Sequence, residues 1–294
     1  MSIATKFSTF CGNLTISTSI RSDISTRYKA ITKRLNKDFW ETDSETLHSL
    51  YVGSYGRKTA INGCSDIDFI FVLPSYYYAI YNGYTSNGQS ALLQRVRQSL
   101  STTYPNTNIG ADGQVVACSF SDDTFFEVVP AFENDDSSFT FPDTNGGGYW
   151  RITNPRPEIQ AIADYDTEFN GNVKHLCKMT RAWKSNCAVP IGGLHIDTLA
   201  IAFLSTWKHN KKSNLYYDWM TRDFMEFLAN QNPARSQWNA IGSNQLIYRQ
   251  GNFEAKAKKA YNLALEAIEY EKNSYEWSAN QKWREIYGSA FPNT

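Results

Sequence analysis

The sequence predicts an α+β protein, and three features of the chain support that prediction. Short apolar segments bounded by turn residues alternate with amphipathic segments in the first half of the 294 residues. Beyond residue 157, apolar residues recur at helical spacing in one long segment after another. Between these halves, residues 133–157 are rich in Asp, Asn, Gly and Pro. We therefore expect a mixed sheet with helices in residues 1–150 and a helical lobe in residues 151–294.

A long helix is predicted near the N-terminus. In residues 24–40, apolar side chains recur at the spacing of one helical face, and Ser and Asp residues upstream are available as caps. The residues of this face are Ile24, Tyr28, Ile31, Leu35 and Phe39.

Three strands are predicted next, in residues 66–74, 113–121 and 124–132. Each segment is short and apolar, and the last two flank a turn-forming SDD. Residues 91–104 carry the i, i+3/i+4 apolar stripe of an amphipathic helix.

Residues 133–157 contain too many turn-forming residues to predict a regular element, so we expect an irregular crossover between the lobes. The remaining chain is predicted to be helical in residues 172–186, 196–210, 217–231 and 253–288.

The composition favours a cytoplasmic protein without a membrane partner. Hydrophobic residues make up 41% of the chain, which is enough to bury a core. Lys and Arg together number 29, as do Asp and Glu, so no net charge attracts nucleic acid or an anionic membrane. The sequence contains neither the pattern of a secretory signal nor an apolar run of about 20 residues.

Cysteine and histidine spacing argues against a disulfide framework and a structural zinc site. The five cysteines form no C-x-x-C pair, and the four histidines form no H-x3-5-H pair.

The main candidate catalytic residues lie in one segment, residues 51–74, with the sequence YVGSYGRKTAINGCSDIDFIFVLP. Side chains alternate along a strand, so Asp66 and Asp68 project from one face while Ile67 and Phe69 point into the core. Two neighbouring carboxylates repel each other unless a cation lies between them, and divalent cations prefer oxygen ligands. The pair is therefore interpreted as a seat for Mg²⁺ or Mn²⁺.

A phosphate-binding turn is predicted directly upstream. Gly53 opens a turn that exposes backbone N–H groups, and the Ser54 hydroxyl adds a donor for a triphosphate. Glu127, in the strand predicted over 124–132, is the expected third carboxylate. Three carboxylates around two metal ions are typical of in-line nucleotidyl transfer. A lone D-x-D is a weak signal, but G-S-x11-D-x-D followed by an apolar strand is a specific one.

Simpler roles compete for some of these residues. Asp66 and Asp68 would also suit a solvated strand edge. Arg57 and Lys58, between the glycine turn and the aspartates, fit a solvated loop as well as they fit a phosphate contact.

Other polar residues near the motif are assigned to turns and packing. Asp122 and Asp123 compete with Glu127 but lie in the turn-forming SDD. His195 adjoins an apolar helix and is predicted to pack rather than to catalyse, and Tyr76–Tyr78 are predicted to form a packed rim rather than a base-stacking platform.

Together, these motifs resemble the DNA polymerase beta-like nucleotidyltransferase superfamily, and within it the CD-NTases, the cGAS/DncV-like nucleotidyltransferases of bacterial CBASS anti-phage defence. The resemblance begins at residues 53–74 and continues through residues 125–135, 142–158, 170–200 and 256–271. The later blocks resemble the CdnE-like branch. The resemblance implies a bilobed fold in which a long N-terminal helix bridges both lobes.

The resemblance also implies roles for individual residues. By position, Gly53 and Ser54 match the phosphate-gripping turn, Asp66 and Asp68 the first two metal ligands, and Glu127 the third. The third ligand is more often an aspartate in relatives, so Glu127 is a departure that leaves the class of chemistry unchanged.

Further nucleotide-binding positions follow from the resemblance. Arg181 falls where many relatives carry a lysine that contacts the triphosphate, and Lys178 one turn earlier is a second candidate; stems packed along the surface are the alternative for both. Gly193 falls where other branches contact the donor nucleotide through Ser or Gln. Asn170 and Asn172 are candidates for an asparagine that reads a pyrimidine.

The predicted function is to join two nucleoside triphosphates, such as ATP and UTP, into a cyclic dinucleotide that activates a downstream effector in anti-phage signalling. Two Mg²⁺ or Mn²⁺ ions are the expected cofactors, and regulatory proteins are further expected partners. The alternatives are a non-cyclising transferase, such as a linear oligonucleotide synthase or nucleotide-adding enzyme, and a nucleotide-binding pseudoenzyme. The sequence lacks the clustered His and Cys of the zinc-bearing insertion in DNA-sensing relatives, which argues against direct DNA sensing.

Overall fold

The chain forms two compact units in the computed structural model, which describes residues 1–63, 66–122 and 124–293. The described residues within 17–56 and 65–156 form the sheet unit, and those within 1–16, 57–64 and 157–294 form the helical unit. This division differs from the one predicted at residues 150 and 151. The reason is that Phe7, Phe10 and Ile61, although early in the chain, belong to the apolar core of the C-terminal helices.

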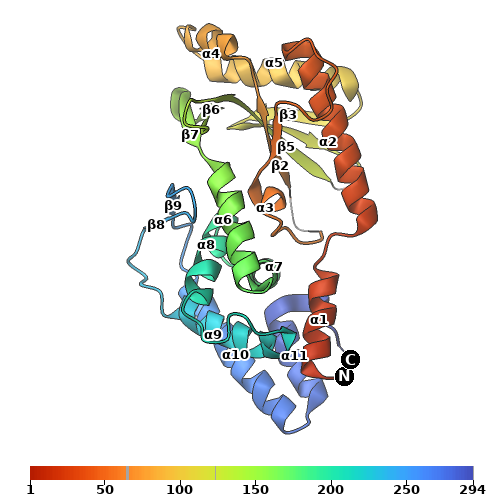
Figure 1. The fold of residues 1–294 in the computed structure, drawn as a ribbon, viewed down its shortest axis with the longest axis vertical. Coiled ribbons are helices and arrows are strands. Elements are labelled where there is room, and N and C mark those ends of the chain that lie inside the picture. Colours follow the sequence, from red (N-terminus) through yellow and green to blue (C-terminus); the bar gives the residue numbers. More distant parts are fainter. Residues whose placement is uncertain (64–65, 123, 294) are drawn as a thin grey trace. The chain divides into compact units, whose positions relative to one another are not determined.

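A mixed sheet forms the centre of the sheet unit (Figure 1). Five of its strands lie side by side in the order β1 (Ser49–Tyr51), β2 (Ile67–Val72), β5 (Phe125–Glu133), β4 (Val115–Ser119) and β3 (Asn108–Asp112). β6 (Phe139–Asp143) pairs with β5, and β7 (Tyr149–Thr153) pairs with β6. β2 and β5 run parallel, whereas their other described neighbours pair antiparallel. The three predicted strands are confirmed as β2, β4 and β5.

The helices of the sheet unit pack on this sheet and on one another. They are α2 (Thr18–Phe39), the short α3 (Gly53–Gly56), α4 (Ser75–Asn82) and α5 (Gly88–Thr103). The predicted apolar face of residues 24–40 is buried in α2, which confirms that helix. α5 is the helix predicted from residues 91–104, and its apolar stripe of Leu92, Val96 and Leu100 is fully buried.

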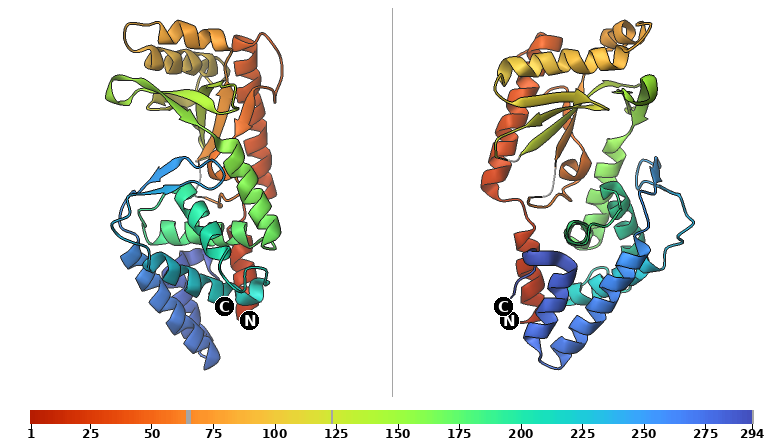
Figure 2. Two further views of the ribbon diagram at one scale, coloured as in Figure 1. Left: turned by 60° about the vertical axis from the view of Figure 1, so that its left-hand side comes forward. Right: turned by 180° about the vertical axis from the view of Figure 1, so that it is seen from behind.

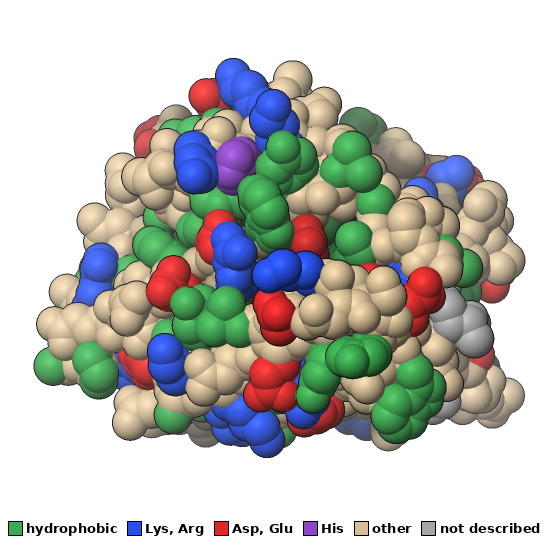
Figure 3. All heavy atoms as spheres, turned by 90° about the horizontal axis from the view of Figure 1, so that it is seen from below, with side chains coloured by type: hydrophobic (Ala, Val, Ile, Leu, Met, Phe, Trp, Pro, Cys, Tyr) green, Lys and Arg blue, Asp and Glu red, His purple; other side chains and the backbone are tan. Residues whose placement is uncertain are grey.

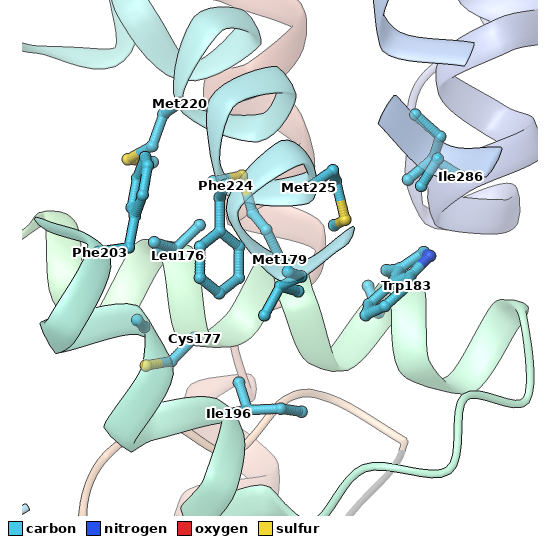
Figure 4. Packing of buried hydrophobic residues seen from close by; sticks show 14 of the residues in the cluster. Leu176, Cys177, Met179, Trp183, Ile196, Phe203, Met220, Phe224, Met225 and Ile286 are labelled. Carbon is cyan, nitrogen blue, oxygen red and sulfur yellow. The ribbon is translucent and has the colours of Figure 1, made fainter. Parts of the chain in front are cut away.

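Figure 2 shows the helices of the helical unit from two further sides. These helices enclose one apolar core. They are α1 (Ile3–Asn13), α6 (Pro155–Glu168), α7 (Asn172–Asn186), α8 (Gly193–Leu204), α9 (Tyr217–Ala229), α10 (Glu254–Lys272) and α11 (Glu276–Tyr287). Its two-stranded sheet pairs β8 (Gln237–Asn239) with β9 (Leu246–Tyr248). In the core, Leu176 and Met179 of α7 lie beside Phe224 of α9 (Figure 4).

The N-terminal helix that was expected to bridge both lobes is two helices, one in each unit. α1 ends at Asn13, and α2 begins at Thr18 after Ser17, whose side-chain oxygen accepts a hydrogen bond from the Ile20 N–H at 3.3 Å. Leu14, in the break, is buried in the core of the helical unit. A cap and a buried apolar residue therefore interrupt the helix where the chain passes between the units.

Residues 133–157 are more regular than predicted. They form β6, the 3-10 turn η1 (Asn145–Gly147), β7 and the start of α6. Phe139 and Phe141 of β6 are buried in the core of the sheet unit, which stabilises the strand despite its turn-forming neighbours. The hairpin turns where the Asn145 N–H donates to the Asp143 carboxylate at 3.0 Å and Gly146 adopts a φ of 60°. Two further 3-10 turns are η2 (Asn214–Tyr216) and η3 (Gly288–Ala290).

The surface carries both signs of charge. On the face drawn in Figure 3, basic and acidic side chains are interspersed among apolar and neutral ones, in keeping with the balanced charge of the sequence. Within the described residues, no helix combines the length and the apolar character that crossing a bilayer requires. Cys11, Cys118, Cys177 and Cys187 carry free thiols, and Cys64 lies outside the described residues.

Candidate active site

Asp68 and Glu127 are direct neighbours on two parallel strands. The register of β2 and β5 pairs Asp68 with Glu127, so both carboxylates project from the same face of the sheet. Both residues are half-buried, whereas Ile67 and Phe69, which alternate with Asp68, are fully buried. The predicted alternation of polar and core residues along this strand is therefore confirmed.

Asp66 immediately precedes β2 and is exposed to solvent. By the alternation of an extended chain, Asp66 would project from the same side as Asp68. The parallel pairing of β2 and β5 brings Asp68 and Glu127 together near the N-terminal ends of these two interior strands.

The glycine turn lies against Asp68. Gly53 opens the short helix α3 with a φ of 58°, a conformation that side chains rarely adopt. A Cβ atom at Gly53 would overlap the carboxylate of Asp68, so the turn approaches Asp68 as closely as it does only because residue 53 is a glycine. The Val52 N–H also donates to the Asp68 carbonyl at 2.9 Å, which fixes the turn to the strand.

The carboxylates fit a divalent cation in their chemistry and in their strand register. All three offer the oxygen atoms that Mg²⁺ and Mn²⁺ prefer, and the absence of a side chain at Gly53 lets the Asp68 carboxylate pack directly against the turn. In the part of the chain that the structure describes, no three His, Cys, Asp or Glu side chains are gathered tightly enough to hold a metal ion.

Arg181 and Gly193, both predicted to contact the nucleotide, are hydrogen-bonded to each other inside the helical unit, and their nucleotide contacts stay predictions. The Arg181 guanidinium is buried, donates to the Asp197 carboxylate at 2.6 and 2.9 Å, and donates to the Gly193 carbonyl at 3.1 Å. An arginine committed to an internal carboxylate has few N–H groups left for a triphosphate. Lys178, one turn earlier on α7, is half-buried.

Asn170 and Asn172 hold a neighbouring loop. The Asn172 amide nitrogen donates to the carbonyls of Asn210 and Lys212 at 2.7 and 2.8 Å, and the Asn170 amide nitrogen donates to that of Lys211 at 3.3 Å. Asn172 is buried, and its side-chain oxygen has no hydrogen-bond partner. Both asparagines line a cavity of about 490 Å³ in the helical unit.

A comparison with known protein families shows which family the chain belongs to. Residues 1–165 match the family of the Second Messenger Oligonucleotide or Dinucleotide Synthetase domain. The chain belongs to this family. The match covers more than half of the 294 residues and confirms the identification of the chain as a CD-NTase.

Similar proteins are found among both sequences and structures. A probable cyclic nucleotide synthase of Bacillus cereus (strain VD146) is 22% identical over 281 residues, which cover 82% of this chain and 81% of the relative. Escherichia coli MS115-1 CdnC, solved with ATP, has a TM-score of 0.69 at 14% identity and covers 98% of both chains. A mutant of the di-nucleotide cyclase DncV from Vibrio cholerae has a TM-score of 0.71 at 10% identity, over 96% of this chain and 93% of that one.

A CdnE c-di-GMP synthase from Capnocytophaga granulosa is also similar, with a TM-score of 0.61 at 15% identity over 90% of this chain and 82% of that one. These structures confirm the predicted α+β nucleotidyltransferase fold. Because CdnC, DncV and CdnE all share it, the assignment of this CD-NTase to the CdnE-like branch stays a prediction.

Sequence reasoning missed a group of buried charges in this CD-NTase. Arg57, which the sequence left open between a solvated loop and a phosphate contact, is buried and pairs with Asp197 at 2.8 Å. Its terminal nitrogen also lies 3.7 Å from Glu158. One signal was available: Asp197 interrupts an otherwise apolar helix, and a buried carboxylate needs a cationic partner.

The residues assigned to packing and turns are found there. His195 is buried against the Trp238 ring at a centroid distance of 4.0 Å. Burial, followed by the charges of Arg249 and Arg235, lowers the pKa of His195 to about 4, so the ring is neutral at pH 7. Asp122 lies in a turn, as predicted, and Asp123 is outside the described residues.

The tyrosines after Pro74 form α4, and two of them pack as a rim. Tyr77 lies 5.3 Å from the Phe39 ring, and Tyr78 lies 5.4 Å from the Phe132 ring. Tyr76 is exposed. The packed-rim prediction is therefore confirmed for Tyr77 and Tyr78.

Proposed function

We propose that this CD-NTase joins two nucleoside triphosphates into a cyclic dinucleotide and that the product activates a separate effector in anti-phage signalling. The observation that carries the proposal is the register of β2 and β5, which pairs Asp68 with Glu127 beside the Gly53 turn. Membership of the second-messenger synthetase family supports it. Nucleoside triphosphate substrates make the cytoplasm the expected location of the reaction.

In the proposed reaction, a ribose hydroxyl of one nucleotide attacks the α-phosphate of another, and pyrophosphate leaves. Asp66, Asp68 and Glu127 would hold two Mg²⁺ or Mn²⁺ ions, which lower the pKa of the attacking hydroxyl and neutralise the leaving pyrophosphate. The backbone N–H groups of the Gly53 turn and the Ser54 hydroxyl would bind the triphosphate.

Contacts with the rest of the nucleotide are proposed for the helical unit. Lys178 and Arg181 of α7 remain the proposed triphosphate contacts, although the Arg181 guanidinium is also bound to Asp197. Asn172 is the candidate reader of a base, and since its amide nitrogen is occupied, it would accept a hydrogen bond from a base N–H. A product containing a pyrimidine remains part of the proposal from the family resemblance alone, because purines also carry N–H groups that this oxygen could accept.

The structures of relatives support nucleotide substrates and a regulatory partner. CdnC was solved with ATP and, separately, in complex with HORMA-deltaN. V. cholerae DncV was solved with the linear intermediate 5′ pppA(3′,5′)pG. By analogy, we expect a two-step reaction through a linear intermediate and a regulatory protein that controls it.

The proposal is tested by incubating the protein with each pair of the four nucleoside triphosphates and Mg²⁺, then identifying the products by mass spectrometry. We expect a product that resists phosphatase, because a cyclic dinucleotide has no terminal phosphate. The control is Asp66→Asn with Asp68→Asn, which should fold normally and make no product. Turnover in that variant would contradict the assignment of the carboxylates, and a phosphatase-sensitive product alone would contradict cyclisation.

A further inference from the structure

Four charged side chains form a buried cluster in the helical unit: Arg57, Glu158, Arg181 and Asp197. All four are buried, and Asp197 is completely so. The two arginines balance the two carboxylates. Isolated charges are strongly disfavoured in a protein interior. Removing one member of this charge cluster would therefore leave a buried charge without its partner.

Asp197, on α8, is the centre of the charge cluster. Arg181 binds it through two nitrogens at 2.6 and 2.9 Å, and the Arg57 Nε donates to it at 2.8 Å. The Thr59 hydroxyl donates to the same carboxylate at 3.2 Å. Although burial alone raises the pKa of Asp197, the charges of Arg181 and Arg57 hold it at about 2, so this residue is ionised at pH 7.

Arg57 also reaches a second carboxylate. Its terminal nitrogen lies 3.7 Å from Glu158 on α6, whose other oxygen accepts a hydrogen bond from the Ser243 hydroxyl at 2.8 Å. Arg57 thus donates a hydrogen bond to Asp197 of α8 and lies beside the charge of Glu158 of α6. The short charge-assisted hydrogen bond to the buried Asp197 carboxylate is the contact that restricts the Arg57 side chain.

Arg57 begins the segment that connects the Gly53 turn to β2. Residues 57–63 fold with the helical unit, whereas the Gly53 turn before them and β2 after them fold with the sheet unit. The far part of the segment is also fastened, because Ile61 is buried in the helical core and the Asn62 N–H donates to the Leu14 carbonyl at 3.0 Å. The segment that joins the phosphate-binding turn to the aspartates therefore has anchors of its own.

We infer that Arg57 and Asp197 are positioning residues for nucleotidyl transfer: they hold the 57–63 segment so that the Gly53 turn and Asp66 and Asp68 keep their geometry during the reaction. Neither residue needs to touch substrate. The inference rests on the proposed function only for the roles of the turn and the aspartates. Misplacement of reacting groups by about 1 Å costs on the order of 100-fold in rate, so the loss of this anchor should be visible in turnover.

The test separates positioning from stability by restoring charge balance without restoring the anchor. Arg57→Met leaves Glu158 buried without its cation, so we expect a lower melting temperature and on the order of 100-fold slower turnover. Adding Glu158→Gln removes the unpaired charge and leaves the balanced Arg181–Asp197 pair. We expect this double variant to recover most of the lost melting temperature but none of the lost turnover. Glu158→Gln alone, which keeps Arg57 on Asp197, is the matched control and should retain turnover.

Hydrogen exchange gives a readout that does not depend on activity. In the Arg57→Met/Glu158→Gln variant, the peptide covering residues 57–63 should exchange faster than in the wild type, while α9 and α10 exchange as before. Recovery of turnover together with melting temperature, or unchanged exchange in residues 57–63, would overturn the inference. If the wild type makes no nucleotide product, the proposed function fails, and the exchange measurement still decides whether Arg57 anchors the segment.

Discussion

The two units of this CD-NTase use their charged residues in opposite ways. In the sheet unit, Asp66 is exposed, and Asp68 and Glu127 are half-buried near the N-terminal ends of β2 and β5. In the helical unit, Asp197 and Glu158 are buried and bound by arginines of the same unit. Carboxylates left open to solvent suit cation and substrate binding, whereas carboxylates neutralised internally hold the fold. The location of a charge, and not its residue type, separates the two uses.

The largest expected effect comes from removing the buried negative charge of Asp197 in the helical unit. Asp197→Asn removes the carboxylate that holds Arg181 and Arg57, and it leaves two buried arginines short of a counter-charge. We expect the free energy of unfolding to fall by about 3–5 kcal/mol. Urea unfolding at pH 7 measures this change, and a loss below about 1 kcal/mol would mean that the charge cluster contributes no more than a surface ion pair.

The next effect concerns the open site of the sheet unit. Gly53→Ala adds a Cβ atom that overlaps the Asp68 carboxylate, and it does so in a backbone conformation with a φ of 58° that alanine disfavours. Asp68 must move away from its present position, so we expect turnover to fall on the order of 100-fold.

The control for this substitution lies in the same sheet. Gly110, in β3, has no neighbouring atom within 4 Å of the position that a Cβ would take, and its φ is not positive. Gly110→Ala should therefore keep wild-type turnover. Equal activity of the two alanine variants would show that the close approach of the turn to Asp68 has no part in the reaction.

The buried His195 of the helical unit makes the stability of the protein depend on pH. Burial lowers the pKa of His195 to about 4, so the unfolded chain binds a proton more readily than the folded chain once the pH drops below about 6.5. Stability should therefore fall as the pH falls. For this one group, the expected loss between pH 7 and pH 5 is about 2 kcal/mol.

His195→Phe tests that expectation because it keeps an aromatic ring beside Trp238 and removes the titrating group. Urea unfolding of both proteins at pH 7 and pH 5 gives the loss for each, and we expect the loss in the variant to be smaller by about 2 kcal/mol. The comparison is made within each protein, so any change in packing cancels. The same loss in both proteins would exclude His195 as a source of acid sensitivity.

The sequence predicted the features that depend on neighbouring residues. The five-residue apolar face of α2 and the alternation around Asp68 are local patterns, and the structure has both. Glu127 was expected near Asp68 from its place in an apolar strand and from the family resemblance, although β3 and β4 lie between β2 and β5 in the chain. In residues 133–157, by contrast, turn residues dominate the composition, and the burial of Phe139 and Phe141 that makes β6 a strand comes from distant parts of the sheet unit.

The charge cluster was beyond the reach of sequence patterns for the same reason. Arg57 and Asp197 are 140 residues apart in the chain, and no local sequence pattern around either residue predicts the contact with the other. Arg181 illustrates the consequence: its place in a motif predicted a triphosphate contact, and only the fold reveals that Asp197 already occupies its guanidinium.

The smallest expected effect is at a solvent-exposed ion pair of the sheet unit. Arg27 binds Asp122 through two nitrogens at 2.9 and 2.8 Å, and these hydrogen bonds lower the pKa of Asp122 to about 2. The Asp122 side chain is nevertheless 47% exposed, so water and salt screen the attraction. We expect Asp122→Asn to lower the free energy of unfolding by less than about 1 kcal/mol, and by less still in 1 M NaCl. A loss as large as that of Asp197→Asn would mean that the geometry of an ion pair, and not its burial, sets its contribution, and the contrast between the two units would lose its physical basis.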